Sequence, residues 1–249
     1  MIIDLAGIRD GTGPARLDMV DMVDMVEGRD KQASKAWLTE HPQAWRDRVE
    51  VVAMDGFTRL ETATTEEPPE AVAVMDPFHV VRLARDALDQ CRRRLQQDTC
   101  GHRGRTGDPL NASRRTLHTG ADLLTDKQQT KLQALFTTDE HAAVEVAWSV
   151  CQQMIAAFRH PDRKTGRTWL NQLIDTLRRG VPNALSELIT LSPDRVPPSR
   201  RAADVLAYSN RPGTSNDPTE AVNGRLKHPR GSAVSFRNLT DHIARSDTR

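Results

Sequence analysis

Two short apolar runs that each end in an aspartate constrain the fold of this chain most strongly. Residues 51–56 read Val-Val-Ala-Met-Asp-Gly, and residues 71–76 read Ala-Val-Ala-Val-Met-Asp. Short, continuous apolar runs rich in valine are typical of buried parallel strands, and helices usually connect such strands. We therefore predict an α/β fold in which two strands deliver Asp55 and Asp76 at their carboxyl ends.

A polar segment far downstream supplies a third acid. Residues 215–227 read Ser-Asn-Asp-Pro-Thr-Glu-Ala-Val-Asn-Gly-Arg-Leu-Lys. The proline predicts the start of a helix with Glu220 in its first turn, and Asn223 and Lys227 then share a face with that glutamate. An acid, an amide and a base on one face suit a metal ion and a phosphate. Together with the strand-end aspartates, they indicate a carboxylate metal site for phosphoryl transfer.

These pieces, in this order, resemble the DDE transposases of the ISL-three insertion-sequence family. The resemblance continues through Pro-Phe-His-Val-Val at 77–81 and a closing Ser-Phe-Arg-Asn-Leu at 235–239, so it covers nearly the whole chain. It implies an RNase H-like (retroviral-integrase-like) core with a large all-helical insertion before the glutamate. It also implies that Asp55 and Glu220 are the second and third catalytic acids and hold Mg²⁺, with two ions in intact relatives.

The resemblance assigns supporting roles to further residues near these acids. Asp76 and His79 match an Asp-x-x-His element, and Asn223 and Lys227 accompany the glutamate. For Asp76 the alternatives are a supporting metal ligand and a residue that caps the following helix or orients its neighbours, and we favour the second. We expect His79 to orient other groups and not to bind metal directly.

The chain departs from the family pattern at its start. The first catalytic aspartate of the family precedes a strand that resembles residues 1–5, and no position of this sequence matches it. We therefore expect an incomplete, N-terminally truncated core without activity of its own, in which Asp4 does not replace the missing acid. Loss of the strand that carries the missing acid would leave its neighbours in the sheet with unpaired edges. We expect those edges to cause self-association or to pair strand 1–5 with strand 51–54. The aspartates of the tandem Asp-Met-Val triplets at 18–26 are expected to be solvated.

Composition excludes some classes of protein. The 249 residues carry a net charge of +1, so bulk charge does not indicate a nucleic-acid partner, and 37% hydrophobic content is enough for a core. We expect Cys91, Cys100 and Cys151 to be reduced and to act as small buried hydrophobes. The sequence has neither a signal peptide nor a long apolar stretch, so we expect a cytoplasmic protein without a membrane partner.

Three regions follow from the pattern along the chain. Residues 1–80 are predicted to form the first part of the core, residues 81–210 a helical insertion, and residues 211–249 the return to the core. Within the insertion, apolar residues recur at helical spacing in three stripes, at 81–95, 144–158 and 170–177. A helix is also predicted at 30–40, a second one near 57–67, a strand-like start at 15–26, and loops at 101–109 and 193–199. We expect Trp148 and Trp169 on the stripes to be core residues. The alternative, which the resemblance implies, is that an aromatic residue of the insertion stacks on a flipped base near the cut.

Local basic clusters are the candidates for contact with DNA, the partner that the resemblance implies. Cationic side chains neutralise phosphates, although interleaved acids make a solvated helix face the alternative. The candidates are Arg92, Arg93, Arg103, Arg105, Arg225, Lys227 and Arg230. A homo-oligomer is the further expected partner.

Two other functions compete with a fragment of a strand-transfer enzyme. One is a non-catalytic module, derived from a transposase, that binds DNA or protein and needs only a basic surface. The other is a phosphatase with Asp55 as nucleophile, because the motif loosely resembles that of the haloacid dehalogenases. We disfavour the phosphatase, since that motif requires an aspartate where this chain has Phe57.

Overall fold

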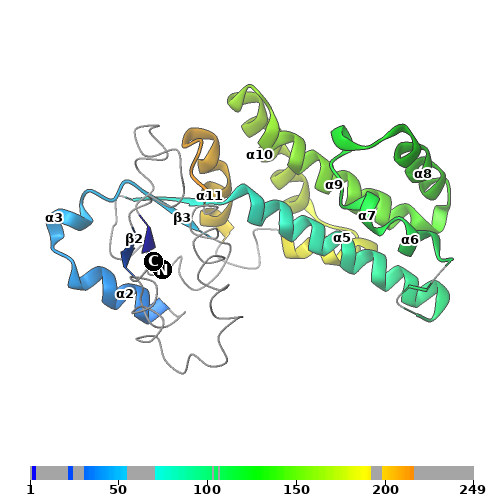
Figure 1. The fold of residues 1–249 in the computed structure, drawn as a ribbon, viewed down its shortest axis with the longest axis horizontal. Helices are drawn as coiled ribbons and strands as arrows, with labels where there is room; N and C mark the ends of the chain where they lie inside the picture. Colours follow the sequence, from blue (N-terminus) through cyan, green and yellow to red (C-terminus); the bar gives the residue numbers. More distant parts are fainter. Residues whose placement is uncertain are drawn as a thin grey trace, which may run out of the picture. The chain divides into compact units, whose positions relative to one another are not determined.

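The chain divides into two compact units. The computed structural model describes residues 2–3, 22–24, 31–54, 71–102, 104–105, 107–191 and 198–215. One unit comprises residues 1–76 with 211–249, and the other comprises residues 77–210 (Figure 1). The boundaries predicted from the sequence, after residues 80 and 210, lie close to these limits. The assignment of the units to a catalytic core and an insertion stays a prediction.

The described part of the chain is a mostly helical α/β structure with a small parallel sheet. In the first unit, β1 (Ile2–Ile3) pairs antiparallel with β2 (Met22–Asp24), which lies inside the Asp-Met-Val repeat. Helices α2 (Lys31–Glu40) and α3 (Gln43–Arg46) follow. The helix predicted at 30–40 is thus confirmed. The strand-like start near residue 15 and the helix near 57–67 lie outside the described residues.

The parallel sheet consists of β3 (Val51–Met54) and β4 (Val72–Met75). The two strands are in register from Val51 opposite Val72 to Met54 opposite Met75, which confirms the predicted parallel pair. Val72 is 36% exposed, whereas Val74 and Met75 are buried. Burial of β4 therefore increases toward its carboxyl end, where the chain continues into Asp76.

The second unit is built from helices. They are α5 (Pro77–Cys100), α6 (Pro109–Ala112), α7 (Arg114–Leu117), η2 (Ala121–Leu123), α8 (Asp126–Phe136), η3 (Asp139–His141), α9 (Ala142–Arg159), α10 (Arg163–Arg179), η4 (Asn183–Leu191) and α11 (Pro198–Asn210). Helix α9 packs against α5 and α10, α5 also packs against η4, and α10 packs against α11 (Figure 1). Every described element of this unit is helical, which confirms the prediction of a helical block.

Local sequence explains where several of these helices begin. Asp108 accepts hydrogen bonds from the backbone N–H groups of Leu110 and Asn111 at the start of α6. Thr125 and Gln128 form a reciprocal capping box at the start of α8, and Asp162 caps α10 in the same way as Asp108 caps α6. Such caps satisfy backbone donors that the first helical turn leaves without a partner.

A glycine lets α9 and α10 approach each other closely. Gly166 is buried in α10, and a Cβ atom at this position would lie 2.4 Å from the carbonyl oxygen of Ala157 in α9. Any other residue would force the two backbones apart. The apolar side of α10 formed by Leu170, Leu173 and Ile174 depends on this close approach for its burial.

Helix α5 differs from its predicted stripe in its second half. Ala84, Leu88 and Cys91 are buried as expected. Beyond them the buried positions are the polar Arg92 and Gln96, and not the apolar Leu95. The reason is a network of polar contacts that the apolar spacing did not reveal.

Two further predictions about single residues are wrong. Cys100 is exposed at the end of α5, whereas Cys91 and Cys151 are buried as predicted, and burial raises the pKa of each of these two thiols to about 11. Trp169 is 45% exposed and meets the ring of His160 edge-on, with ring centroids 4.7 Å apart. Trp148 is half-buried against Phe136. None of the described helices combines the length and apolar character that crossing a bilayer requires.

Candidate functional site

The carboxyl end of β4 holds a buried carboxylate with a partner from the far end of the chain. Asp76 directly follows Met75 and is 2% exposed. The Ser215 hydroxyl donates a hydrogen bond to Asp76 Oδ2 at 2.9 Å, which joins residues 139 positions apart. Both residues belong to the first unit. The returning chain is thereby attached to the end of the strand.

The turn before Ser215 is fixed as well. The Thr214 backbone N–H donates to the carbonyl oxygen of Arg211 at 3.4 Å, and Thr214 is 4% exposed. Gly213 has a φ angle of +81°, a conformation that side chains rarely adopt. The turn therefore sets the point at which the polar segment leaves the strand end.

The two predicted catalytic acids, Asp55 and Glu220, lie outside the described residues, as do Asn223, Lys227, Arg225 and Arg230. The sequence nevertheless limits their distance from the strand end. Asp55 is the residue after Met54, which stands opposite Met75 in the sheet. Glu220 is five residues after Ser215, and five residues reach at most roughly 18 Å when fully extended.

His79 lies in the first turn of α5, in the second unit. It is half-buried, and its ring meets that of Phe78 edge-on at 5.5 Å between centroids. Phe78 is 50% exposed. The supporting role predicted for His79 stays a prediction.

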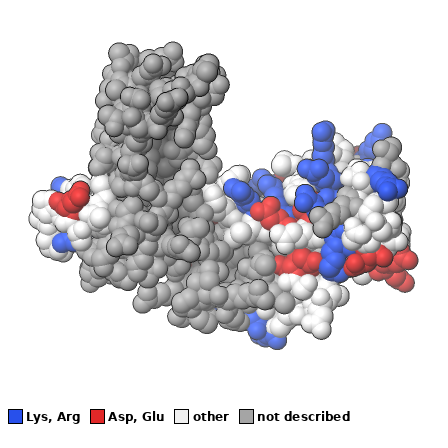
Figure 2. Space-filling model, turned by 90° about the horizontal axis from the view of Figure 1, so that it is seen from below, with Lys and Arg blue, Asp and Glu red and all other residues white. Residues whose placement is uncertain are grey.

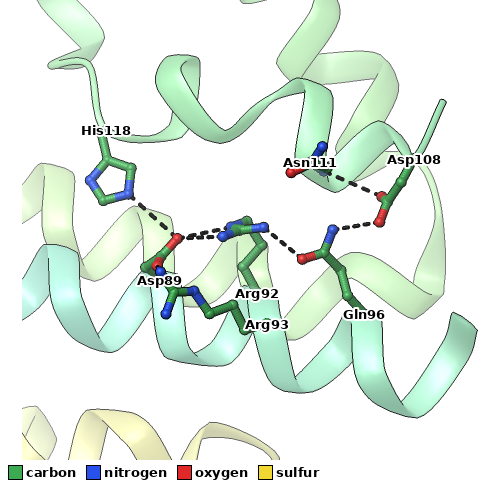
Figure 3. A network of polar contacts seen from close by, with 7 residues as sticks. All are labelled: Asp89, Arg92, Arg93, Gln96, Asp108, Asn111 and His118. Atoms are coloured by element: carbon green, nitrogen blue, oxygen red, sulfur yellow. Dashed lines mark hydrogen bonds and ion pairs between the residues drawn. The ribbon is translucent and has the colours of Figure 1, made fainter. Parts of the chain in front are cut away.

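A second polar cluster occupies the middle and end of α5, and Figure 3 shows its members. Arg92 is 3% exposed; its Nε and Nη2 donate to Asp89 Oδ1 at 3.0 and 2.6 Å, and its Nη1 donates to Gln96 Oε1 at 2.6 Å. Gln96 in turn donates to Asp108 Oδ2 at 2.5 Å. Because Asp108 also caps α6, the network ties α5 to the loop that follows it.

The arginines predicted to contact DNA differ in how the structure places them. Arg92 would have to give up buried bonds to Asp89 and Gln96 before it could reach a phosphate. The Arg93 side chain is 52% exposed and pairs with Asp89 Oδ2 at 2.7 Å. Arg105 is exposed, and Arg103 lies outside the described residues. Figure 2 shows basic and acidic side chains interspersed on the described helical surface, including a row of acidic side chains that basic ones interrupt.

Electrostatics within this cluster favour an ionised Asp89. Burial acts to raise the pKa of this carboxyl group, but the hydrogen bond from Arg92 and the charges of Arg92, Arg93 and His118 outweigh it and lower the pKa. His118 Nε2 lies 3.8 Å from Asp89 Oδ1. The pKa of His118 is lowered, mainly by burial and against the opposing effect of Asp89.

An open hollow of about 300 Å³ adjoins the cluster, lined by Arg114, Arg115, His118 and Thr119. The sequence pattern predicted neither this hollow nor the polar network beside it. The available signal was the polar spacing of Asp89, Arg92 and Gln96, because residues three and four apart share one helix face.

No group of three or more His, Cys, Asp or Glu side chains suited to a metal ion occurs among the residues that the structure describes. The predicted metal ligands themselves are not in that set.

Comparison with known proteins identifies the family. The family model described as transposase, of the ISL-three DDE type, matches residues 12–246. No curated protein and no solved structure matches the chain. The match spans most of the sequence and includes the three motifs on which the resemblance rests. The chain belongs to the ISL-three family of DDE transposases.

Proposed function

We propose that the chain is part of the catalytic domain of a transposase, with an RNase H-like core that in intact relatives serves in metal-dependent cleavage and transfer of DNA strands. The observation that carries the proposal is the strand end itself. β3 and β4 finish side by side in parallel register, and Ser215 ties the glutamate-bearing segment to the same end. Parallel strands that finish together bring the residues after them to one edge of the sheet.

The donor set suits Mg²⁺. Asp55 and Glu220 supply carboxylate oxygens, and hard divalent ions prefer oxygen ligands. Asp76 is buried and already accepts a bond from Ser215, which supports an orienting role for it beside these two ligands. When bound, divalent ions activate the attacking oxygen and stabilise the departing one.

Other residues of the chain serve to hold the DNA. Asn223, Lys227, Arg225 and Arg230 follow Glu220 closely in sequence and are proposed to contact phosphates near the cut. On the helical unit we propose Arg93, Arg103 and Arg105, and we leave out Arg92 because its side chain is buried. Self-association through unpaired strand edges remains part of the proposal, and sedimentation of the purified chain tests it.

The metal site can be tested without relying on strand transfer. Fe²⁺ substituted for Mg²⁺ generates radicals in the presence of ascorbate and peroxide, and these cut the backbone near the ion. We expect cuts beside residues 55, 76 and 220 in the full chain, suppressed by excess Mg²⁺. They should disappear in Asp55→Asn and Glu220→Gln but persist in Asp47→Asn, a matched exposed control. Cuts elsewhere, or cuts unchanged in the two variants, would refute the site.

A second candidate function, a non-catalytic DNA-binding module, is favoured by the accessible arginines of the helical unit. It needs no metal. Under this alternative, DNA binding would persist in the presence of a chelator while no metal-directed cuts appeared. Metal-directed cuts at the three sites would instead favour the catalytic proposal.

A further inference from the structure

The hollow on the helical unit is lined by groups suited to an anion. Arg114 and Arg115 are exposed, and His118 and Thr119 are half-buried. The hollow measures about 300 Å³, enough for a phosphate group and part of its neighbouring sugars. Guanidinium groups bind phosphate through paired, charge-assisted hydrogen bonds, and two adjacent arginines supply several such donors.

The positive charge at this hollow is not neutralised. Neither Arg114 nor Arg115 has an ion-pair partner among the described residues. Asp89, which lies 3.8 Å from the His118 ring, already has its two oxygens engaged by Arg92 and Arg93. Arg85 adds a further positive charge that acts on His118. The hollow therefore has a surplus of cations over anions.

The wall of the hollow is held in place from beneath. Leu117 and Thr116 of α7 are 1% and 6% exposed. Gln152 of α9 donates to the carbonyl oxygen of Thr119 at 3.1 Å and accepts from the Ala121 N–H at 2.7 Å. The buried residues beneath the hollow hold this anion-binding site in place before a ligand arrives, which reduces the entropic cost of ordering it on binding.

We propose that this hollow binds a backbone phosphate of DNA and so forms a second point of contact, separate from the strand-end site. The inference rests on the proposed function only in taking DNA as the partner, and it requires neither a metal ion nor catalysis. The contact recognises the phosphodiester and not the base sequence, because its charged donors are the two guanidinium groups of Arg114 and Arg115.

The test is the salt dependence of DNA binding by the full chain, measured with a fluorescent duplex in the presence of a chelator. Each phosphate contact contributes roughly 0.9 to the slope of log affinity against log salt. In Arg114→Ala/Arg115→Ala we expect the slope to fall by about 1, which makes affinity about threefold less sensitive to salt between roughly 50 and 200 mM. Circular dichroism establishes that the variant keeps its helices.

The matched control is Lys127→Ala/Arg179→Ala, which removes the same charge from exposed positions outside the hollow. Its slope should equal that of the unchanged chain. Equal slopes in the two double variants, or an unchanged chain that does not bind DNA, would overturn the proposal. Competition with inorganic phosphate separates the sources: displacement at low phosphate concentration would indicate a site for free phosphate and would also overturn it.

Chemical protection supplies a measurement that does not depend on a variant. Phenylglyoxal modifies exposed arginines, and mass spectrometry locates the modified residues. We expect bound duplex to slow modification of Arg114 and Arg115 severalfold while Arg179 reacts at its usual rate. Equal protection of all three would contradict a localised contact. A failure of the metal-directed cuts at residues 55, 76 and 220 would refute the catalytic proposal and leave this one standing.

Discussion

Asp76 and Asp89 are both withdrawn from solvent, but they use their oxygens differently. Asp89 is held by residues of its own helix, Arg92 and Arg93, and lies near His118. Asp76 accepts a hydrogen bond from the hydroxyl of Ser215, 139 positions away. The first carboxylate stabilises one helical unit through charge, whereas the second fixes where a distant segment returns.

The largest expected effect comes from breaking the network around Asp89. Arg92→Ala should lower the free energy of unfolding of the helical unit by about 3–5 kcal/mol, because Asp89 and Gln96 lose the buried charged donor to which they are hydrogen-bonded. Chemical denaturation followed by circular dichroism measures this loss.

Arg93→Ala is the matched control for that experiment. Its side chain is 52% exposed and contacts the same carboxylate, so its removal should cost at most about 1 kcal/mol. If the two variants lost equal stability, the difference in burial would not govern the strength of these pairs.

A smaller effect is expected at the strand end. Ser215→Ala removes the hydroxyl that donates a hydrogen bond to Asp76. This should lower the free energy of unfolding by about 1–3 kcal/mol, because the acceptor is a buried carboxylate. Hydrogen exchange at the amides of β4 should accelerate. Ser215→Thr keeps a hydroxyl and should restore slow exchange. Unchanged exchange in the alanine variant would show that the hydrogen bond does not anchor the returning segment.

The smallest effect concerns pH and His118. Its pKa in the folded chain lies below the ordinary value of 6.5, so the unfolded chain binds more protons as the pH falls. Stability is therefore complete above the ordinary value and decreases as the pH falls toward the lower, folded pKa. Asp89, Arg85 and Arg114 are the charged groups that act on this ring.

In His118→Gln the loss of stability between about pH 7 and 5 should be smaller than in the unchanged chain. Denaturation at a series of pH values measures it. Asp89 titrates in a separate window below its ordinary value of 3.8 and contributes stability that is lost only there. An identical pH profile in the variant would exclude a role for His118.

Sequence pattern predicted the elements better than the contacts between them. The parallel pair β3 and β4, the helix at 31–40 and the helical block all follow from apolar runs and periodicity, because burial of one face dictates which residues must be apolar. The prediction that Trp169 is a core residue was wrong. An apolar stripe identifies one side of a helix, but the width of the buried part depends on which neighbours cover it.

Polar contacts were harder to predict for a different reason. The bond between Ser215 and Asp76 joins segments whose approach depends on the whole fold, and no local spacing encodes it. Burial of Arg92 depends on Gln96 and Asp108 together, since each satisfies the next. The acids Asp55 and Glu220 came from family resemblance, and their positions stay predictions.

Gly166 has a consequence for recognising relatives of this chain. It lies four residues after Asp162, which caps α10, and only a glycine permits the backbone of α9 to pass so close. An Asp-x-x-x-Gly pattern between two amphipathic stripes therefore marks this hairpin by its geometry. Where a relative keeps this pattern, the hairpin provides a fixed point from which the remaining helices can be aligned.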